Sequence, residues 1–252
     1  MRISVVTVCF NSAATIADAC RSVAVQRHAE VEHLVIDGGS SDATVALANA
    51  AARPGARVSS APDRGIYDAM NKGIRQATGE VVGFLNGDDL LEDASVLDRV
   101  AKAFADPSVE CAYGDLVYVR QDDTAAVVRR WRANWYRPSL SRCCLAPPHP
   151  TFYARRSTYQ RLGTYHQDLW IANDFELMTR FLVRHRVRAR YIPAVLVRMR
   201  LGGVSNRTVG GVIEQNRDIV RALRRNGLAP SPLAPLVKAL VRVREYVAGA
   251  HR

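Results

Sequence analysis

The chain has 252 residues, enough for one large α/β domain or for one domain with an appended subdomain. Its net charge of +11 is uneven, because residues 1–124 carry 11 Lys and Arg against 18 Asp and Glu, whereas residues 125–252 carry 24 against 6. No stretch approaches the roughly 18 uninterrupted apolar residues of a membrane-spanning helix. The five cysteines have no metal-ligand spacing and an odd count, so we expect reduced thiols and neither a disulfide scaffold nor a spanning protein.

Strands and helices are predicted to alternate along the first half of the chain. A continuous β-branched run at 3–9 predicts a strand buried on both faces, and a helix follows it. Further strands are predicted at 33–37, 57–60 and 81–85, with helices ending near residue 52 and spanning 66–76. The short links imply a doubly wound, mostly parallel sheet flanked by helices. In such sheets ligands bind beyond the carboxyl ends of the strands, which is where four polar residues fall: Asn11, Asp37, Asp63 and Asp88.

The second half is predicted to be less regular. A helix is expected at 95–105, strands at 110–120 and 127–131, a loop-rich segment at 131–150, helices at 157–162 and 174–184, and an extended segment at 190–200. Two helices, over 209–225 and 233–248, follow. The last one places leucine and valine near one face and basic residues on the other side, which fits either a membrane surface or packing on the domain.

Three linked motifs carry a resemblance to a known family. The stretch PDRGIYDAMNKGI at 62–74 precedes ATGE at 77–80 and then GFLNGDD at 83–89. This run resembles the nucleotide-sugar-binding half of family 2 glycosyltransferases, and bacterial polysaccharide and glycolipid enzymes of the colanic-acid type in particular. The resemblance spans roughly residues 3–206 and implies a GT-A fold, a nucleotide-diphosphate sugar donor, a divalent metal and an inverting mechanism.

The resemblance also implies positions for the sugar nucleotide. The first strand end, from Thr7 to Asn11, and the acidic end of the second strand, Asp37, would hold the base and ribose. The segment from 63 to 72 would lie against the nucleotide and its phosphates through Asp63, Arg64, Asn71 and Lys72. The alternative for this segment is a surface helix with ordinary i, i+4 pairs, worth only about 0.2–0.5 kcal/mol each.

The turn at 86–89 occupies the place of the family's Asp-x-Asp motif, with Asn86 in its first position. The resemblance assigns metal coordination chiefly to Asp88, with Asp89 as a supporting ligand, and leaves Asn86 for the ribose or a metal-bound water. The expected ion is Mn²⁺ or Mg²⁺, both of which take oxygen ligands. The alternative is a solvated turn, since Asn, Gly and Asp are usual turn residues.

A second acidic motif, IANDFEL at 171–177, resembles the family segment that supplies the general base. Asp174 is then expected to take the proton from the acceptor hydroxyl, and Asn173 stands where a first acid is usual. A helix N-cap is the alternative, and both roles can hold together. The segment PHPTFYARR at 148–156 resembles the acceptor-side segment of the family, so His149 is expected to contact the acceptor or a phosphate.

We therefore expect a metal-dependent inverting hexosyltransferase that uses a UDP-, GDP- or dTDP-linked sugar and a lipid-linked saccharide or glycolipid acceptor. The expected catalytic domain covers 1–206, with a nucleotide-sugar half at 1–106 and an acceptor half at 107–206, and 207–252 is a basic helical extension. The N-terminal segment has no signal-peptide pattern, so we expect a cytoplasmic protein, peripheral at an anionic inner membrane surface. Two alternatives remain: a catalytically inert sugar-nucleotide-binding module, and a basic protein that binds nucleic acid or another polyanion, although no nucleic-acid-binding motif is present.

Overall fold

The computed structural model describes residues 1–169, 172–202 and 209–247, with side chains omitted at 209–213 and 242–247. The first half contains β1 (Ile3–Cys9), α1 (Ile16–Ala24), β2 (Val31–Asp37), α2 (Thr44–Ala51), β3 (Arg57–Ser60), α3 (Ile66–Gln76) and β4 (Val81–Asn86). It continues with β5 (Leu90–Leu91), α4 (Val96–Ala103), β6 (Cys111–Val119) and β7 (Val127–Trp131). The remaining elements are η1 (Pro138–Cys143), η2 (His149–Thr151), β8 (Tyr153–Arg155), α5 (Arg156–Leu162), α6 (Asn173–Thr179), η3 (Arg180–Arg184), β9 (Ala189–Arg200), α7 (Val209–Arg225) and α8 (Ala234–Val247).

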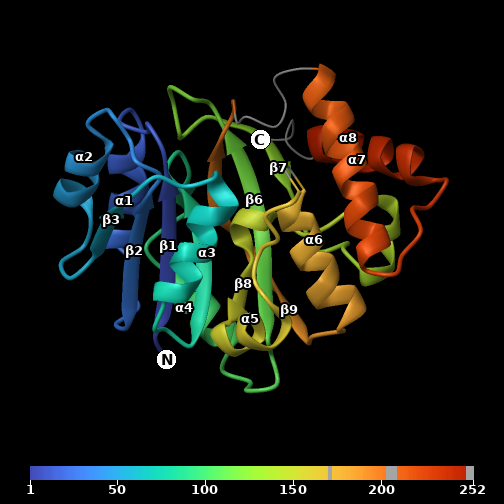
Figure 1. Ribbon diagram of the computed structural model, residues 1–252, viewed down its shortest axis with the longest axis horizontal. Helices are drawn as coiled ribbons and strands as arrows, with labels where there is room; N and C mark the ends of the chain where they lie inside the picture. Colours follow the sequence, from blue (N-terminus) through green and yellow to red (C-terminus); the bar gives the residue numbers. More distant parts are fainter. Residues whose placement is uncertain (170–171, 203–208, 248–252) are drawn as a thin grey trace.

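The strands form one sheet in the order β3-β2-β1-β4-β8-β6-β9-β5, with β7 paired to β6. The pairs among β1, β2, β3 and β4 are parallel, whereas β8 runs antiparallel to both β4 and β6. Figure 1 shows the first βα units at one end of the molecule and α7 and α8 at the other. The predicted α/β sheet is therefore confirmed, parallel in its first half and mixed beyond β4.

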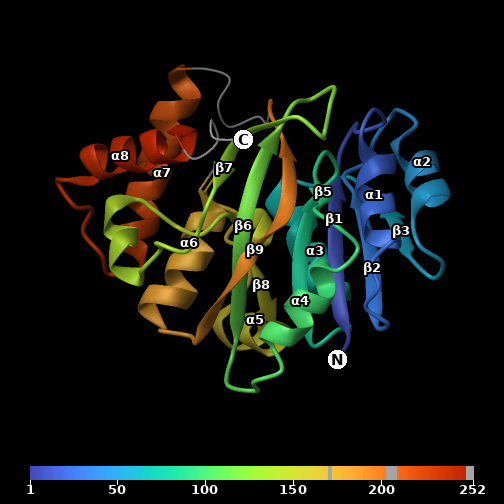
Figure 2. The ribbon, with the colours of Figure 1, turned by 180° about the vertical axis from the view of Figure 1, so that it is seen from behind.

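Helices cover both faces of the sheet, because the buried strands have apolar side chains on both sides. On one face Val6 and Val8 of β1 share a hydrophobic cluster with Met70 of α3 and Phe181 of η3. On the other face Ile3 and Val5 pack with residues of α1 and α4, which Figure 2 shows in front of the sheet. This alternation along a single strand produces a three-layer arrangement.

The C-terminal helices pack on the second half of the sheet domain. Ile219, Ala222 and Leu223 of α7 join Leu169 and Phe175 in one hydrophobic cluster. The expected boundary at 206/207 falls among residues that the structure does not describe, so the division into 1–206 and 207–252 stays a prediction. Within the described ranges no helix combines the length and hydropathy needed to cross a bilayer.

Two expectations about secondary structure need correction. The predicted helix 174–184 is two segments, α6 and the π-helical turn η3. The short strands β5 and β8 were not predicted, because two or three residues carry too little periodicity to identify a strand.

Candidate active site

The polar strand ends predicted from the sequence lie at one edge of the sheet. The register pairs Cys9 with Asp37 on one side of β1 and Val8 with Asn86 on the other. The backbone continues this contact, since the N–H of Gly38 donates to Cys9 and the N–H of Gly87 donates to Val8. The turn after β2 and the acidic turn after β4 therefore flank the end of β1.

Asp37 organises the loop after β2. Its Oδ2 accepts hydrogen bonds from the N–H groups of Gly39 (3.1 Å) and Ser40 (2.9 Å) and from the Ser60 hydroxyl (2.6 Å), and the side chain is 1% exposed. Burial alone would raise the pKa of Asp37, but the hydrogen bonds from Ser40, Ser60 and Gly39 hold it below its usual value. The carboxylate therefore determines the shape of the loop after β2.

Asn11 ties the end of β1 to the same loop. Its N–H donates to the Ser40 hydroxyl at 2.7 Å, and its side-chain oxygen accepts from the N–H of Ser41 at 3.0 Å. Asn11 has φ of 47°, a left-handed conformation that asparagine tolerates better than most residues. The two loops thus form one connected surface.

Thr7 lies apart from this surface. Its side chain is 0% exposed, and its hydroxyl contacts His33 Nε2 on β2 at 2.9 Å. The hydroxyl points along the sheet to a neighbouring strand and does not reach the sheet edge. The Thr7 side chain is therefore not part of the surface that the two loops form.

The segment before α3 approaches the Asp37 loop closely. A Cβ atom placed on Gly38 would lie 2.7 Å from Oδ2 of Asp63, so the glycine lets this carboxylate approach the loop backbone closely. Lys72 Nζ donates to the carbonyl of Pro62 at 2.8 Å and holds this turn from the helix side. Arg64 is 76% exposed and lies 3.9 Å from Asp68, which leaves its guanidinium at the surface.

Asn71 has a structural partner in the second half of the chain. Its side chain is 3% exposed and bonds both ways with the backbone of Tyr165, as acceptor from the N–H (3.0 Å) and as donor to the carbonyl (2.8 Å). The Tyr165 ring stacks on Tyr67 with centroids 5.5 Å apart and meets Phe84 of β4 edge to face. Asn71 therefore joins the two halves of the molecule and does not present its amide to a ligand.

A buried arginine, Arg200, holds the acidic turn after β4 in place. The guanidinium of Arg200, 5% exposed, donates to the carbonyl of Asp88 at 2.8 Å and to the carboxylate of Asp18 at 2.8 Å. Asp89 is 0% exposed, and one of its oxygens accepts from the Asn86 amide at 2.9 Å. Arg200 belongs to β9, which also pairs with β5 immediately after the turn.

Two buried side-chain oxygen atoms of this turn lack a hydrogen-bond partner. Asn86 Oδ1 and Asp89 Oδ1 are buried and have no hydrogen-bond partner. Burial raises the pKa of Asp89 well above its usual range, and the neighbouring Asp88 carboxyl raises it further. Burial also raises the pKa of Asp88, against the opposing charge of Arg200. Adjacent acids with orphaned oxygens fit a hard divalent cation, which would stabilise both carboxylates.

The candidate ligand set is small. In the part of the chain that the structure describes, no group of three or more His, Cys, Asp or Glu side chains gathers to hold a metal ion. The side-chain oxygen atoms of the turn belong to Asp88, Asp89 and Asn86, and the remaining coordination positions would belong to substrate or water.

Asp174 lies in the first turn of α6, close to the Tyr67 hydroxyl. Its Oδ1 accepts from the N–H of Phe175 at 2.8 Å and from the Tyr67 hydroxyl at 3.4 Å. His149 lies close enough for the charge of Asp174 to raise its pKa, yet burial dominates and leaves the pKa of His149 below its usual value. His149 Nε2 is buried without a hydrogen-bond partner, so the neutral ring retains one nitrogen that makes no hydrogen bond.

Three functional residues were not identified from the sequence. Tyr67 looks like an ordinary helix residue in the sequence, and nothing in the sequence pattern connects Arg200 with the acidic turn that it holds. The third, Glu176, is 0% exposed and bonds Arg180 at 3.1 Å and Asn226 of the segment after α7 at 3.1 Å. Only the i, i+4 spacing of Glu176 and Arg180 could have indicated their pairing.

Comparisons with known proteins identify the family of the chain. Residues 4–176 match the family described as Glycosyl transferase family 2. A relative from Mycobacterium bovis, named PGL/p-HBAD biosynthesis glycosyltransferase, is 30% identical over 215 residues, which cover 82% of this chain and 80% of the relative.

Solved structures share the fold. The mannosyltransferase PcManGT from Pyrobaculum calidifontis, solved with GDP-Man and Mn²⁺, superposes with a TM-score of 0.64 at 22% identity, covering 96% of this chain and 69% of that one. S. aureus TarS gives a TM-score of 0.63 at 17% identity over 90% of this chain, which spans 39% of the TarS length. With the match across 4–176 and these neighbours, the chain belongs to glycosyl transferase family 2 and adopts the GT-A fold.

Proposed function

We propose that this protein transfers a hexose from a nucleotide-diphosphate sugar to a lipid-linked saccharide or glycolipid, with inversion at the anomeric carbon and with the help of Mn²⁺ or Mg²⁺. The observation that carries the proposal is the meeting of the Asp37 loop, the Asp63 turn and the acidic turn at one sheet edge. PcManGT, a neighbour in fold, was solved with a sugar nucleotide and Mn²⁺, which supports the same ligand class here.

The sugar nucleotide is proposed to lie across the end of β1. The loop at Asn11 and Asp37 would contact the base and ribose, and Asp63 would approach from the side of α3. Arg64 has an exposed guanidinium that can turn toward a phosphate. A divalent ion held by Asp88 and Asp89, with the oxygen of Asn86 nearby, would neutralise the charge of the departing diphosphate.

Asp174 is the proposed general base. It would accept the proton of the acceptor hydroxyl while that oxygen attacks the anomeric carbon on the face opposite the diphosphate. A single displacement of this kind forms one C–O bond, breaks the bond to the diphosphate and inverts the configuration. General-base assistance is worth about 10²–10⁴-fold in rate. His149 Nε2 is buried without a hydrogen-bond partner, and His149 is the residue proposed to contact the acceptor or a phosphate.

A panel of nucleotide sugars tests the donor site. UDP-, GDP- and dTDP-sugars are added with and without Mn²⁺, and the melting temperature of the protein is measured. One donor class is expected to raise the Tm in a metal-dependent way, because a ligand that binds only the folded state stabilises it. If none of these sugars shifts the Tm, the donor site is wrong.

Two variants separate an enzyme from an inert binding module. Asp88→Ala should abolish both hydrolysis of the nucleotide sugar and transfer of labelled sugar to a membrane lipid fraction. Asp174→Asn should abolish transfer and keep hydrolysis, because only transfer requires deprotonation of the acceptor. Asp122→Asn, whose carboxylate is 70% exposed and paired with Arg120, is the surface control. Transfer that survives in Asp174→Asn would contradict the assigned base.

A nucleic-acid-binding function is the alternative raised by the basic second half. It leaves the acidic turn and its orphaned oxygens without a role, so the geometry favours the enzyme. Salt-dependent retention on DNA at physiological ionic strength, without any response to sugar nucleotides, would favour the alternative.

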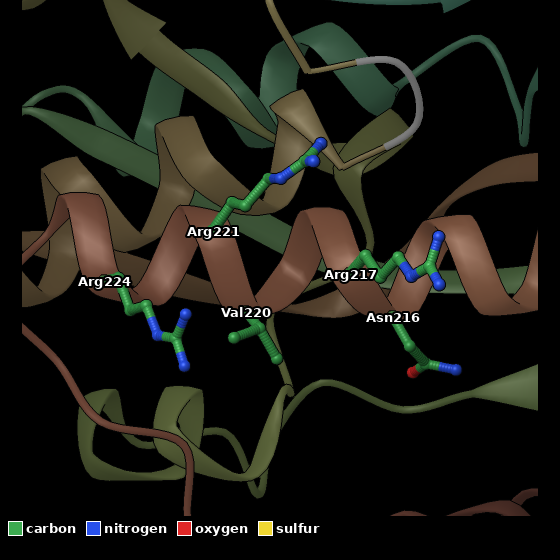
Figure 3. Close-up of a pocket in the computed structure, with 5 residues that line it drawn as sticks. All are labelled: Asn216, Arg217, Val220, Arg221 and Arg224. Carbon is green, nitrogen blue, oxygen red and sulfur yellow. The ribbon is translucent and has the colours of Figure 1, made fainter.

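The acceptor is proposed to be reached at an anionic membrane surface through α7 and α8. Side chains from successive turns of α7 line a shallow hollow, which Figure 3 shows: Asn216, Arg217, Val220, Arg221 and Arg224. Lys238 of α8 reaches Asn216 at 3.4 Å and ties the two helices together. Leu233, Leu236 and Leu240 are 60%, 59% and 62% exposed, an apolar row at helical spacing. Arginine near an anionic surface adds about 1 kcal/mol per residue.

Vesicle co-sedimentation tests this contact. The protein should bind vesicles that contain phosphatidylglycerol and should bind neutral phosphatidylcholine vesicles weakly. Leu236→Ser with Leu240→Ser, and separately Arg217→Gln with Arg224→Gln, should each reduce binding. A matched control, Arg120→Gln, removes one exposed basic group elsewhere. Equal binding by all variants would contradict the surface.

A further inference from the structure

Helix α6 begins without a capping side chain of its own. The residue before its first turn is Ala172, and no side-chain hydrogen bond caps the helix. The first N–H groups of a helix have no partner within it and usually bind a nearby Ser, Thr, Asp or Asn side chain. Because Asp174 stands in this first turn, the orientation of the proposed base depends on how the turn is held.

The hydroxyl of Tyr67 lies at this helix start. It is 3.4 Å from Oδ1 of Asp174. Burial and the charge of Asp174 raise the pKa of Tyr67 well above its usual range, and the backbone of Asp174 and Asn173 opposes this rise. The phenol therefore stays protonated at neutral pH and can donate to the carboxylate.

The Tyr67 ring is carried by α3 of the first half of the chain and packs on Tyr165 of the second half. Tyr67 belongs to α3, which begins at Ile66 directly after the Asp63 turn. It stacks on Tyr165, whose backbone is clamped by both ends of the Asn71 amide. A contact between Tyr67 and α6 thus connects the helix that follows the proposed phosphate-binding turn to the proposed base.

We propose that Tyr67 is a positioning residue: from α3 it caps the start of α6 and sets the direction of the Asp174 carboxylate toward the acceptor hydroxyl. This inference rests on the proposed function, since it concerns the base named there. It assigns to the motif GIYDAMNKG a second role besides binding the sugar nucleotide. The role requires the hydroxyl and not only the aromatic ring.

Tyr67→Phe tests the role because it keeps the stack on Tyr165 and removes the hydroxyl alone. Transfer is expected to fall about tenfold in kcat, in line with the loss of one hydrogen bond to a charged group. The KM for the nucleotide sugar and the rate of its hydrolysis should stay within about twofold of wild type, since neither donor binding nor donor hydrolysis uses the base. The ratio of transfer to hydrolysis is therefore the main readout.

Tyr159→Phe is the matched control. Tyr159 is also a buried tyrosine, 1% exposed, but its hydroxyl has no hydrogen-bond partner. Its transfer-to-hydrolysis ratio should equal that of wild type. An unchanged ratio in Tyr67→Phe overturns the proposal, as does an equal loss of transfer and hydrolysis, which would indicate general damage to the fold.

A double-mutant cycle on thermal stability tests the contact without any activity. The Tm is measured for wild type, Tyr67→Phe, Asp174→Ala and the double variant. Partners in contact are non-additive, and the expected coupling is about 2–4 °C for a chain of this size. Additive changes overturn the proposal. If Asp174→Asn transfers sugar normally while the cycle shows coupling, the assigned base fails and the contact stands, so the two failures are distinguishable.

Discussion

Lowering the pH is expected to destabilise the sheet through one buried histidine, His33 of β2. The side chain is 1% exposed, its Nε2 contacts the Thr7 hydroxyl, and its Nδ1 has no hydrogen-bond partner. Burial lowers the pKa of His33 from 6.5 to about 4, with a smaller contribution from the charge of Arg53. The folded protein therefore resists protonation of a ring that the unfolded chain protonates readily.

The direction and size of the stability change follow from the difference between the pKa of His33 in the folded and in the unfolded chain. Between pH 6.5 and 4 the unfolded chain binds a proton that the folded chain does not, so stability is full above pH 6.5 and is lost as the pH falls. A difference of about 2.5 pKa units corresponds to about 3 kcal/mol near pH 4. At pH 5 the loss is about 2 kcal/mol relative to pH 8.

Urea unfolding at pH 8 and pH 5 measures the effect. His33→Gln keeps a polar side chain and cannot titrate, so its free energy of unfolding should fall by about 2 kcal/mol less than that of wild type over the same interval. His185→Gln, at an exposed histidine, should behave as wild type. If wild type and His33→Gln lose the same stability on acidification, the reasoning from burial is refuted.

Three further predictions concern the site and its supports. Arg200→Met should raise the Mn²⁺ concentration for half-maximal activity about tenfold, because partners behind a metal site commonly change affinity 10–100-fold; an unchanged metal titration would argue against its support of the acidic turn. Gly83→Ala should lower the free energy of unfolding by about 1–3 kcal/mol, since a Cβ there would lie 2.1 Å from the ring of Tyr153; denaturant unfolding decides this. Glu176→Gln should lower the free energy of unfolding by about 3–5 kcal/mol, because it leaves the buried guanidinium of Arg180 without its counter-charge. A shift in Tm below 3 °C would contradict this prediction.

The first half of the fold was predictable because its signals are local. A continuous β-branched run such as 3–9 identifies a strand buried on both faces, and the rule for parallel sheets then places Asp37 and Asp88 at one edge. In the structure Asp37 ends β2 and Asp88 lies in the turn after β4, and both strands pair with β1.

The residues that hold the site residues in place were not predictable in the same way, because their contacts join positions that are distant in the sequence. Arg200 reaches Asp88, 112 residues away, and Tyr67 reaches Asp174, 107 residues away. The direction of the Thr7 hydroxyl depends on which strand lies beside it, and periodicity does not provide that. Residue type alone shows none of these pairings.

The position of β9 bears on the shortest polypeptide that can work as this enzyme. The family match ends at residue 176, so a recombinant fragment cut there would keep each acidic residue assigned to the site. It would lack the strand that pairs with β5 and the guanidinium that holds the Asp88 carbonyl. The smallest autonomous unit with an ordered acidic turn therefore extends at least to Arg200, and an end point for expression or crystallisation belongs beyond it.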